Sequence, residues 1–314
     1  MTSLRKLGSS DLQVFPLSLG GNVFGWTADE AQSFAVLDAY AAAGGNFVDT
    51  ADTYSSWIPG NEGGESETVL GKWFAARGNR SDVVLATKVG SHPSFKGLAA
   101  STIKAGAEES LRRLGTDYID LYYTHHDDET VPVEEIITAL DQLVKEGKVR
   151  EIAASNISPE RLRASLDFSE REGLARYVAL QPHYNLVSRD TYEGALQDTA
   201  AGAGLAAVPY SALASGFLTG KYRPGTTVDS ARAGGAAQHL ETGRGQKVLA
   251  ALDKVAQERN AEIATVALAW LASRPTVAAP IASARTVEQL PALVAVADLR
   301  LTDQDLAELT EASA

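Results

Sequence analysis

The sequence predicts an α/β fold, a closed (β/α)8 (TIM) barrel, and three observations support this fold class. Apolar runs of strand length alternate with helical patterns along almost the whole chain. Most of these runs are nearly continuous in apolar residues, which is typical of parallel strands with both faces buried. The chain has 314 residues and no linker between these units, so we expect residues 1–314 to form one barrel domain.

An open, doubly wound sheet is the competing fold. Such a sheet usually carries a phosphate-binding turn, G-x-G-x-x-G, after its first strand. The corresponding segment here, LSLGGNVFGW at positions 17–26, does not contain that pattern. The closed barrel is therefore favoured.

A short β-hairpin is expected in LRKLGSSDLQVFP, residues 4–16, before the first barrel strand. It would cover the bottom of the barrel, where the strands begin. Eight strands are then predicted, each followed by a helix. Their apolar runs occupy residues 17–21, 46–49, 83–88, 118–125, 150–156, 177–181, 205–210 and 276–281.

Helix boundaries are predicted from capping residues. Thr27 and Glu30 match a T-x-x-E capping box at the start of the first helix. Ser158 followed by Pro159 is typical of an N-cap and a first helical position. A final helix is expected after Thr302, which would cap it.

Residues 222–243 depart from this regularity. They are rich in Gly, Arg and Ala, and they are predicted to form a long loop before a helix that starts near Gln246. Long loops of this kind often carry function.

Composition limits the partners and the location. The formal net charge is −12, whereas binding to nucleic acid or to an anionic membrane requires a basic face. The chain has no cysteine, which excludes disulfides and cysteine-based metal sites, and we predict no metal site. The first ten residues lack the apolar core of a signal peptide, and no apolar run is long enough to cross a bilayer. We therefore expect a soluble, cytoplasmic protein that binds neither nucleic acid nor membrane, of undetermined oligomeric state.

Four ionisable side chains fall at predicted strand ends or just after them. Asp49 ends the second strand, Tyr54 lies in the loop that follows it, Lys88 ends the third strand and His125 ends the fourth. In such a barrel the carboxyl ends of the strands meet at one face, where active sites are built. We expect these side chains to face one cavity, with Asp49 and Lys88 paired, because burying either charge alone is costly.

This combination suits the reduction of a carbonyl group, which needs a hydride on carbon and a proton on oxygen. A free tyrosine has a pKa of about 10 and is a weak acid at neutral pH, but an adjacent ammonium group lowers that pKa. Tyr54 is therefore predicted as the general acid, assisted by Lys88, which Asp49 holds in place. His125 is expected to donate a hydrogen bond to the substrate oxygen. None of the four can supply a hydride, so a cofactor is required.

The segments that carry these residues resemble the catalytic signatures of the aldo-keto reductase family. They are GGNFVDTADTY, VLATKVG and YIDLYYTHHDD. Four more segments extend the resemblance, in order, over essentially the whole chain: EIAASNISPERL, LQPHYNLVSR, PYSALASGFLTGKY and PIASARTVEQL. The resemblance implies an NAD(P)H-dependent reductase of small-molecule aldehydes or ketones, with the four residues above as its catalytic tetrad.

The resemblance also implies the residues that contact the cofactor. The nicotinamide carboxamide would bind Ser155, Asn156 and Gln181, and the ring of Tyr210 would stack on the nicotinamide. Arg285 would meet the 2′-phosphate of NADP(H), since a guanidinium matches phosphate geometry. The other implied contacts are Gly21, Asn22, Ser211, Leu213, Ser215, Gly216, Leu218, Gly220, Lys221, Ile281, Ser283 and Gln289.

Some positions depart from the family pattern. Ser283 stands where many relatives have a phosphate-binding lysine, so NADP(H) is expected to be preferred but NAD(H) stays possible. The loop SSWIPGNEGGESE is longer than the usual segment after the catalytic tyrosine and should reshape the substrate pocket. Substrate contacts are predicted for Phe24, Trp26, Trp57 and His126; the substrate itself is left open.

Two other functions stay open at this point. One is a cofactor-sensing partner protein on the same fold, which potassium-channel β subunits resemble. The other is a lyase or aldolase that forms a Schiff base at Lys88. The expected pairing with Asp49 disfavours this second function, because a Schiff-base lysine must become neutral.

Overall fold

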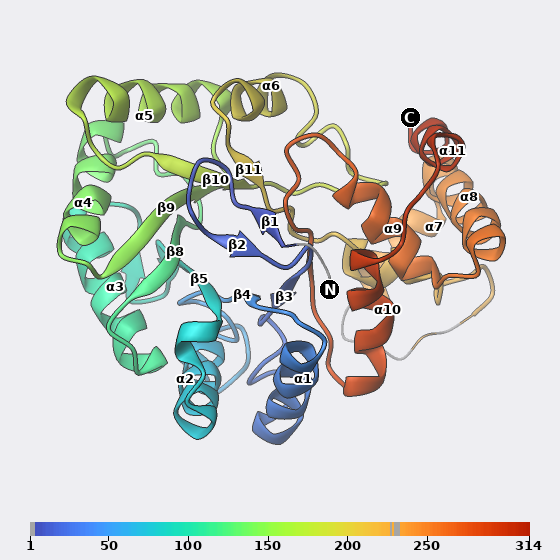
Figure 1. Cartoon of the computed structure of the whole chain (residues 1–314), viewed down its shortest axis with the longest axis horizontal. Helices are drawn as coiled ribbons and strands as arrows, with labels where there is room; N and C mark the ends of the chain where they lie inside the picture. Colours follow the sequence, from blue (N-terminus) through green and yellow to red (C-terminus); the bar gives the residue numbers. More distant parts are fainter. Residues whose placement is uncertain (1–3, 227, 229–232) are drawn as a thin grey trace.

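Eight parallel strands form the main sheet of the computed structural model, which describes residues 4–226, 228 and 233–314 (Figure 1). Neighbouring strands follow the order β11-β10-β9-β8-β5-β4-β3-β12. The strands are β3 Ser18–Gly20, β4 Phe47–Asp49, β5 Val84–Val89, β8 Ile119–Thr124, β9 Val149–Ser155, β10 Tyr177–Gln181, β11 Ala206–Ala207 and β12 Ile281–Ala282. Each predicted run overlaps one of these strands, so the predicted fold class is confirmed.

The barrel closes between β11 and the segment that precedes β12. The N–H of Ala207 donates to the carbonyl oxygen of Thr276 at 2.8 Å, and the N–H of Ala278 donates to that of Ala207 at 2.9 Å. Pro280 has no N–H and interrupts this ladder, so the regular strand begins only at Ile281. The last predicted strand is thus correct in position but wrong in extent.

Helices lie between the strands and cover the outside of the sheet (Figure 1). They are α1 Glu30–Ala42, α2 Glu65–Arg77, α3 Ala100–Leu114, α4 Val133–Lys145, α5 Pro159–Glu172, α6 Ala195–Gly202, α7 Ala233–Leu240, α8 Gly243–Arg259, α9 Ile263–Ala272, α10 Leu290–Val294 and α11 Asp303–Ala312. The short elements are the hairpin β6 Ser91–His92 and β7 Phe95–Lys96, and the 3₁₀ turns η1 Arg80–Asp82, η2 Ala214–Thr219, η3 Val287–Gln289 and η4 Ala295–Ala297. The predicted caps of α5 and α11 are confirmed, since the side chains of Ser158 and Thr302 each accept a hydrogen bond from the third helical N–H.

The start of α1 differs from the prediction. Its N-cap is Asp29, whose carboxylate accepts the N–H of Gln32 at 2.8 Å while the Gln32 side chain accepts the N–H of Asp29 at 3.1 Å. The capping box predicted from Thr27 and Glu30 is therefore wrong. Thr27 instead belongs to the preceding turn, where its N–H donates to the carbonyl oxygen of Val23.

Residues 222–243 contain α7, so the prediction of a long loop is wrong for this part; positions 227 and 229–232 lie outside the described residues. Two adjacent glycines give the α7 sequence a low helix propensity, which is why the sequence favoured a loop. Packing compensates, since the ring of His239 lies 5.2 Å from that of Phe217 in η2. Tertiary contact thus overrides local preference here.

The N-terminal hairpin closes the bottom of the barrel, as predicted. Strand β1 Arg5–Lys6 pairs antiparallel with β2 Gln13–Val14. Leu7, Leu12 and Val14 are buried in one cluster with inward-facing side chains of the barrel strands. The other end of the barrel, at the carboxyl ends of the strands, is therefore open.

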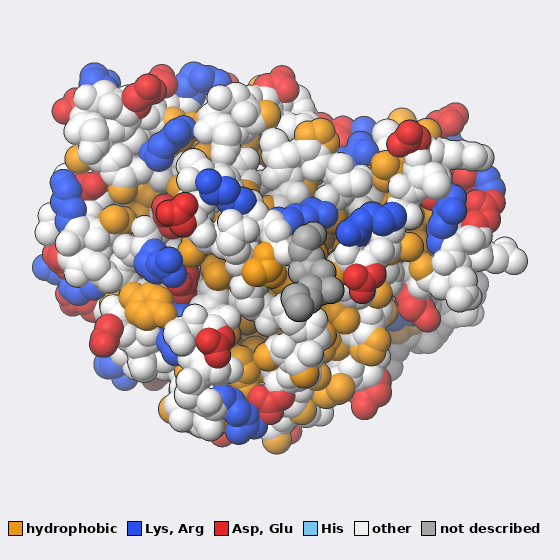
Figure 2. Space-filling model, in the orientation of Figure 1, with side chains coloured by type: hydrophobic (Ala, Val, Ile, Leu, Met, Phe, Trp, Pro, Cys, Tyr) orange, Lys and Arg blue, Asp and Glu red, His pale blue; other side chains and the backbone are white. Residues whose placement is uncertain are grey.

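Figure 2 shows the face of the molecule that carries this hairpin, in the orientation of Figure 1. Lys and Arg side chains are interspersed with Asp and Glu side chains across it and do not gather in one patch. The described helices are all too short or too polar to span a lipid bilayer.

Candidate active site

A cavity of about 700 Å³ opens at the carboxyl ends of the strands. Asp49 ends β4, Ser155 ends β9, Gln181 ends β10 and His125 directly follows β8, and all four line it. In barrels of this type the loops at this end build the active site. Other predicted site residues that line the cavity are Asn22, Trp26, Tyr54, Trp57, His126, Asn156, Tyr210, Ser211, Leu213, Ser215, Gly216, Lys221, Ile281, Ser283, Arg285 and Gln289.

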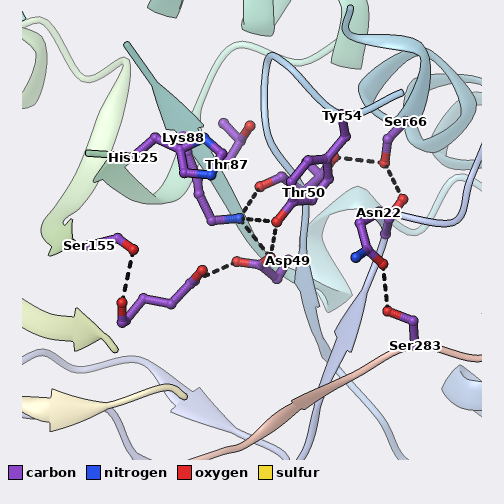
Figure 3. Close-up of polar contacts among 12 residues, drawn as sticks. Asn22, Asp49, Thr50, Tyr54, Ser66, Thr87, Lys88, His125, Ser155 and Ser283 are labelled. Atoms are coloured by element: carbon purple, nitrogen blue, oxygen red, sulfur yellow. Dashed lines mark hydrogen bonds and ion pairs between the residues drawn. The ribbon is translucent and has the colours of Figure 1, made fainter. Parts of the chain in front are cut away.

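Asp49, Tyr54 and Lys88 form one hydrogen-bonded group at the wall of this cavity (Figure 3). The Nζ of Lys88 donates to Asp49 Oδ2 at 2.7 Å and to the Tyr54 hydroxyl at 2.8 Å. It also donates to the backbone carbonyl oxygen of Thr50 at 2.7 Å. The Tyr54 hydroxyl in turn lies 3.3 Å from Asp49 Oδ2. The structure thus brings these three predicted residues together from β4, β5 and the loop after β4. Asp49 and Tyr54 line the cavity, whereas Lys88, also expected to face it, is fully buried in contact with them and does not line it.

The ammonium of Lys88 is fully buried, and its contacts with Asp49, Tyr54 and Thr50 compensate its charge. An ammonium has three N–H donors, and each of the three contacts above uses one. Burial lowers the pKa of Lys88, and the carboxylate of Asp49 opposes that shift most strongly. Because an unpaired buried charge is very costly, the ion pair between Lys88 and Asp49 is a requirement for burying either group.

His125 lies beside Tyr54, with ring centroids 6.1 Å apart at 77°. Burial lowers the pKa of His125 well below its usual value, and the charges of Lys88 and His126 add to this. The imidazole is therefore neutral at physiological pH and keeps one N–H donor. Among the described residues, its Nδ1 has no hydrogen-bond partner. His125 itself lines the cavity, so its ring can contact a ligand there, and the ring of His126 stacks on it with centroids 4.9 Å apart.

A polar wall next to Asp49 is formed by residues from the following strands. The side-chain amide of Gln181 donates to Asp49 Oδ1 at 2.8 Å, and the hydroxyl of Ser155 donates to the backbone carbonyl oxygen of Gln181 at 2.8 Å. The hydroxyl of Tyr210 donates to Asn156 Oδ1 at 2.8 Å. These amides and hydroxyls are the donors and acceptors that a carboxamide requires.

The segment after β11 has a strained backbone. Ser211, Ala214 and Ser215 have positive φ angles of 54°, 47° and 56°, although none is glycine. Each such residue costs about 1 kcal/mol or more, and this strain tends to cluster at ligand sites. Leu218 and Gly220, predicted as cofactor contacts, do not line the cavity, and their N–H groups bond to backbone carbonyls of their own turn.

Two cations, Lys221 and Arg285, line the cavity. Nearby, the Ser283 hydroxyl donates to Asn22 Oδ1 at 2.8 Å, which links the loops after β12 and β3 (Figure 3). The Oε1 of Gln289 accepts the backbone N–H of Arg285 at 2.9 Å, which fixes the turn that presents this arginine. The positive charges of Lys221 and Arg285 match what a phosphate requires.

An aromatic pair lies at the mouth of the cavity. The rings of Trp26 and Trp57 are 5.6 Å apart and nearly perpendicular, and Trp57 is 48% exposed. The Trp57 ring also lies 6.3 Å from the Tyr54 ring. The long loop after Tyr54 thus brings Trp57 to the cavity, which it lines.

Two predicted contacts are corrected by burial. Phe24, expected to contact substrate, is fully buried in the hydrophobic core and does not line the cavity. Gly21, expected to contact the cofactor, does not line it either; a Cβ there would lie 2.8 Å from Ser66 Oγ and 3.2 Å from the Phe24 ring. Gly21 therefore serves close packing.

Sequence reasoning missed several residues that line the cavity, among them Val23, Thr27, Glu262 and Ala264. Glu262 and Ala264 lie at the start of α9, so no strand end marks them. The excursion through α7, α8 and α9 between the last two strands brings them here. Within the described ranges, no three His, Asp or Glu side chains are grouped so that they could hold a metal ion.

The chain is similar in sequence to several known proteins. A family model described as "Aldo/keto reductase family" matches residues 16–314. The chain is 36% identical to "Uncharacterized oxidoreductase YrpG" of Bacillus subtilis, over 97% of this chain and 94% of the relative. It is 32% identical to "Norsolorinic acid reductase stcV" of Emericella nidulans, over 96% and 78%. It is also 33% identical to "Probable voltage-gated potassium channel subunit beta" of Oryza sativa subsp. japonica, over 91% and 88%.

Proposed function

The chain belongs to the aldo/keto reductase family, and we propose that it is an NADPH-dependent oxidoreductase that reduces aldehyde or ketone carbonyls of small molecules to alcohols. The observation that carries this proposal is the 2.8 Å contact between the Tyr54 hydroxyl and the buried Lys88 ammonium at the cavity wall. Asp49, Tyr54, Lys88 and His125 are proposed as the catalytic residues of a single barrel domain, residues 1–314.

The cavity suits a nicotinamide dinucleotide in its chemistry. The amides and hydroxyls of Ser155, Asn156 and Gln181 would hold the carboxamide, and the strained turn at Ser211–Gly216, most of which lines the cavity, would lie along the pyrophosphate. Lys221 and Arg285 supply positive charge for the phosphates. When bound, the cofactor supplies the hydride that none of the four catalytic side chains can provide.

Tyr54 would donate the proton that the carbonyl oxygen takes up when its carbon receives the hydride. The C=O double bond thereby becomes C–H and O–H, and Tyr54 is left as a phenolate. The Lys88 ammonium stabilises that phenolate from 2.8 Å away. Asp49 accepts from both Lys88 and Gln181, so it fixes the position of the ammonium.

His125 would orient the substrate. Its imidazole is neutral because burial lowers the pKa of His125 far below the usual value. A neutral imidazole can donate a hydrogen bond to the carbonyl oxygen without competing with Tyr54 as the acid. The hydrogen bond also stabilises negative charge that develops on this oxygen in the transition state.

Arg285→Leu is expected to weaken NADPH binding about 10- to 100-fold and NADH binding much less. A hydrogen bond to a charged group contributes about 1.5–3 kcal/mol, and only NADPH has the 2′-phosphate that Arg285 is proposed to meet. Fluorescence titration of both proteins with both cofactors measures this difference. Arg176→Leu, at an exposed arginine outside the cavity, is the control. An equal loss for both cofactors would assign Arg285 to a group that they share.

Trp57→Ala is expected to lower kcat/KM for aromatic aldehydes about 3- to 10-fold, with little effect on small aliphatic ones. Aromatic pairs contribute about 0.5–1.5 kcal/mol beyond area burial, and the half-exposed Trp57 ring at the mouth is placed to pack on a planar substrate. Trp57→Phe keeps a ring and serves as the matched control. A uniform loss over both substrate classes would show that Trp57 supports the loop and not the substrate.

A steady-state assay of NADPH oxidation with a panel of aldehydes and ketones tests the proposed function directly. The similarity to a protein named as a potassium-channel β subunit favours one second candidate, a cofactor-sensing partner protein. A sensor would bind NADPH tightly but turn over very slowly with every carbonyl compound. Turnover at rates typical of enzymes, with at least one substrate, decides between the two.

A Schiff-base mechanism at Lys88 is disfavoured by the contacts of its ammonium. All three N–H donors are engaged, and the group is fully buried beside a carboxylate, whereas a Schiff-base lysine must be neutral and reach the substrate carbon. Borohydride trapping of a substrate adduct on Lys88 would reverse this assignment.

A further inference from the structure

Asp52 is a buried carboxyl group that the proposed reaction does not use. Its side chain is completely buried, and it does not line the cavity. Its backbone N–H donates to the carbonyl oxygen of Lys88 at 3.2 Å, so it lies directly against the strand that carries the catalytic ammonium. Among the described residues, neither carboxylate oxygen of Asp52 makes a hydrogen bond of good geometry, although the backbone amide of Gly90 lies near enough to lower the pKa of Asp52. An ionised carboxylate buried in this way would be very costly, so its charge state needs an explanation.

A second buried carboxylate, Glu67 of α2, lies near Asp52 and is fully paired. Its Oε2 accepts from the Nε of Arg113 at 2.7 Å, and its Oε1 accepts from the hydroxyl of Thr87. The guanidinium of Arg113 is thus engaged by Glu67. Within the part of the chain that the structure describes, Asp52 therefore has no ion-pair partner of its own, and the negative charge of Glu67 acts on it.

The charged and titratable groups around Asp52 come from four elements. They are Glu67 of α2, Arg113 of α3, Lys88 of β5 and Tyr122 of β8, and His92 of β6 faces the first two. Burial and then Glu67 raise the pKa of Asp52 to about 8, while Arg113, Lys88 and the Gly90 amide oppose that shift. Asp52 accordingly holds a proton at neutral pH.

We propose that Asp52 is a positioning residue of the active site, a protonated carboxyl whose neutrality leaves the Lys88 ammonium paired with Asp49 and in contact with Tyr54. The three N–H donors of Lys88 bond to Asp49, to Tyr54 and to the backbone carbonyl oxygen of Thr50, and none bonds to Asp52. When Asp52 loses its proton, a second negative charge acts on the same ammonium. Part of the positive potential at Tyr54 is then cancelled, and Tyr54 becomes a weaker acid. This inference rests on the proposed function, since it assigns the ammonium a role in proton transfer.

The pH dependence of turnover tests this role. In the wild type, kcat for carbonyl reduction is expected to fall as the pH rises through about 8. In Asp52→Asn, which cannot ionise, this part of the alkaline limb is expected to disappear. Asp117→Asn makes the same chemical change at an exposed position and should leave the profile unaltered. A merely structural role would scale kcat equally at every pH, and that result would overturn the proposal.

Difference infrared spectroscopy tests the proton itself, without any turnover. The wild type should show the carbonyl stretch of a protonated carboxylic acid at neutral pH, and Asp52→Asn should lack it. Glu67→Gln removes the repelling charge and should make the wild-type band disappear at a lower pH. Absence of a band that depends on Asp52 would overturn the proposal even if Asp52→Asn folds poorly. If the wild type reduces no carbonyl compound, the proposed function fails, whereas the band still decides whether Asp52 is protonated.

Discussion

Tyr54→Phe is expected to lower kcat about 10²- to 10⁴-fold, the usual contribution of a positioned general acid, while the Kd for NADPH changes little. The substitution removes only the hydroxyl, which contacts the Lys88 ammonium at 2.8 Å. It leaves the aromatic ring and its packing on His125 and Trp57 in place. NADPH oxidation at saturating substrate gives kcat, and fluorescence titration gives the Kd.

Tyr118→Phe provides the matched control, because Tyr118 precedes β8 and so lies at the opposite end of the barrel. It should retain full activity. If Tyr54→Phe is equally active, the proton comes from another group, and His125 is the next one at this wall of the cavity. A large loss of NADPH affinity would instead mean that the hydroxyl contacts the cofactor.

Lys88→Met is expected to abolish measurable turnover and to lower the free energy of unfolding by about 3–5 kcal/mol. Lys88 is 0% exposed and Asp49 is 1% exposed, so the substitution leaves the buried Asp49 carboxylate without its counter-ion. Gln181 still donates to Asp49, but an amide does not neutralise its charge. Urea denaturation measures the stability, and the NADPH assay measures turnover.

An exposed ion pair and a double variant make this test specific. Lys72→Met breaks the pair with Glu30, whose side chains are 57% and 50% exposed, and should cost no more than about 1 kcal/mol. Combining Asp49→Asn with Lys88→Met removes both buried charges, so stability should recover in part while activity does not. A Lys88→Met protein as stable as the wild type would contradict the account of a buried, mutually dependent pair.

Local patterns in the sequence were sufficient for the eight strands and for the N-terminal hairpin. Parallel strands in a covered barrel are apolar on both faces, so each one appears in the sequence as a short, nearly continuous apolar run. The positions of Asp49, Lys88 and His125 followed from the same runs, because a polar residue at the end of an apolar strand marks the carboxyl-terminal face. The capping side chains of α5 and α11 were likewise readable, since an N-cap acts within one turn.

Contacts between distant segments were not readable in this way. Helix α7 forms although its glycines disfavour it, because it packs against η2. Phe24 was expected at the substrate pocket and is instead buried in the core. Glu262 lines the cavity from the start of a helix that no strand end marks. In each case the position of the residue or helix depends on contacts with segments that are distant in the sequence, or on a helix start that the strand pattern does not reveal.

The sequence by itself determined the barrel, the order of its strands along the chain and the placement of Asp49, Lys88 and His125 at or near the carboxyl ends of three strands. The tertiary structure alone decided which charges are paired. Asp49 ends β4 and Asp52 follows it by three positions, yet the first meets an ammonium at 2.7 Å and the second makes no hydrogen bond of good geometry among the described residues. The physical reason is that the energy of a charge depends on its burial and on its neighbours in space, and both are set by how β5, α2 and α3 pack around it.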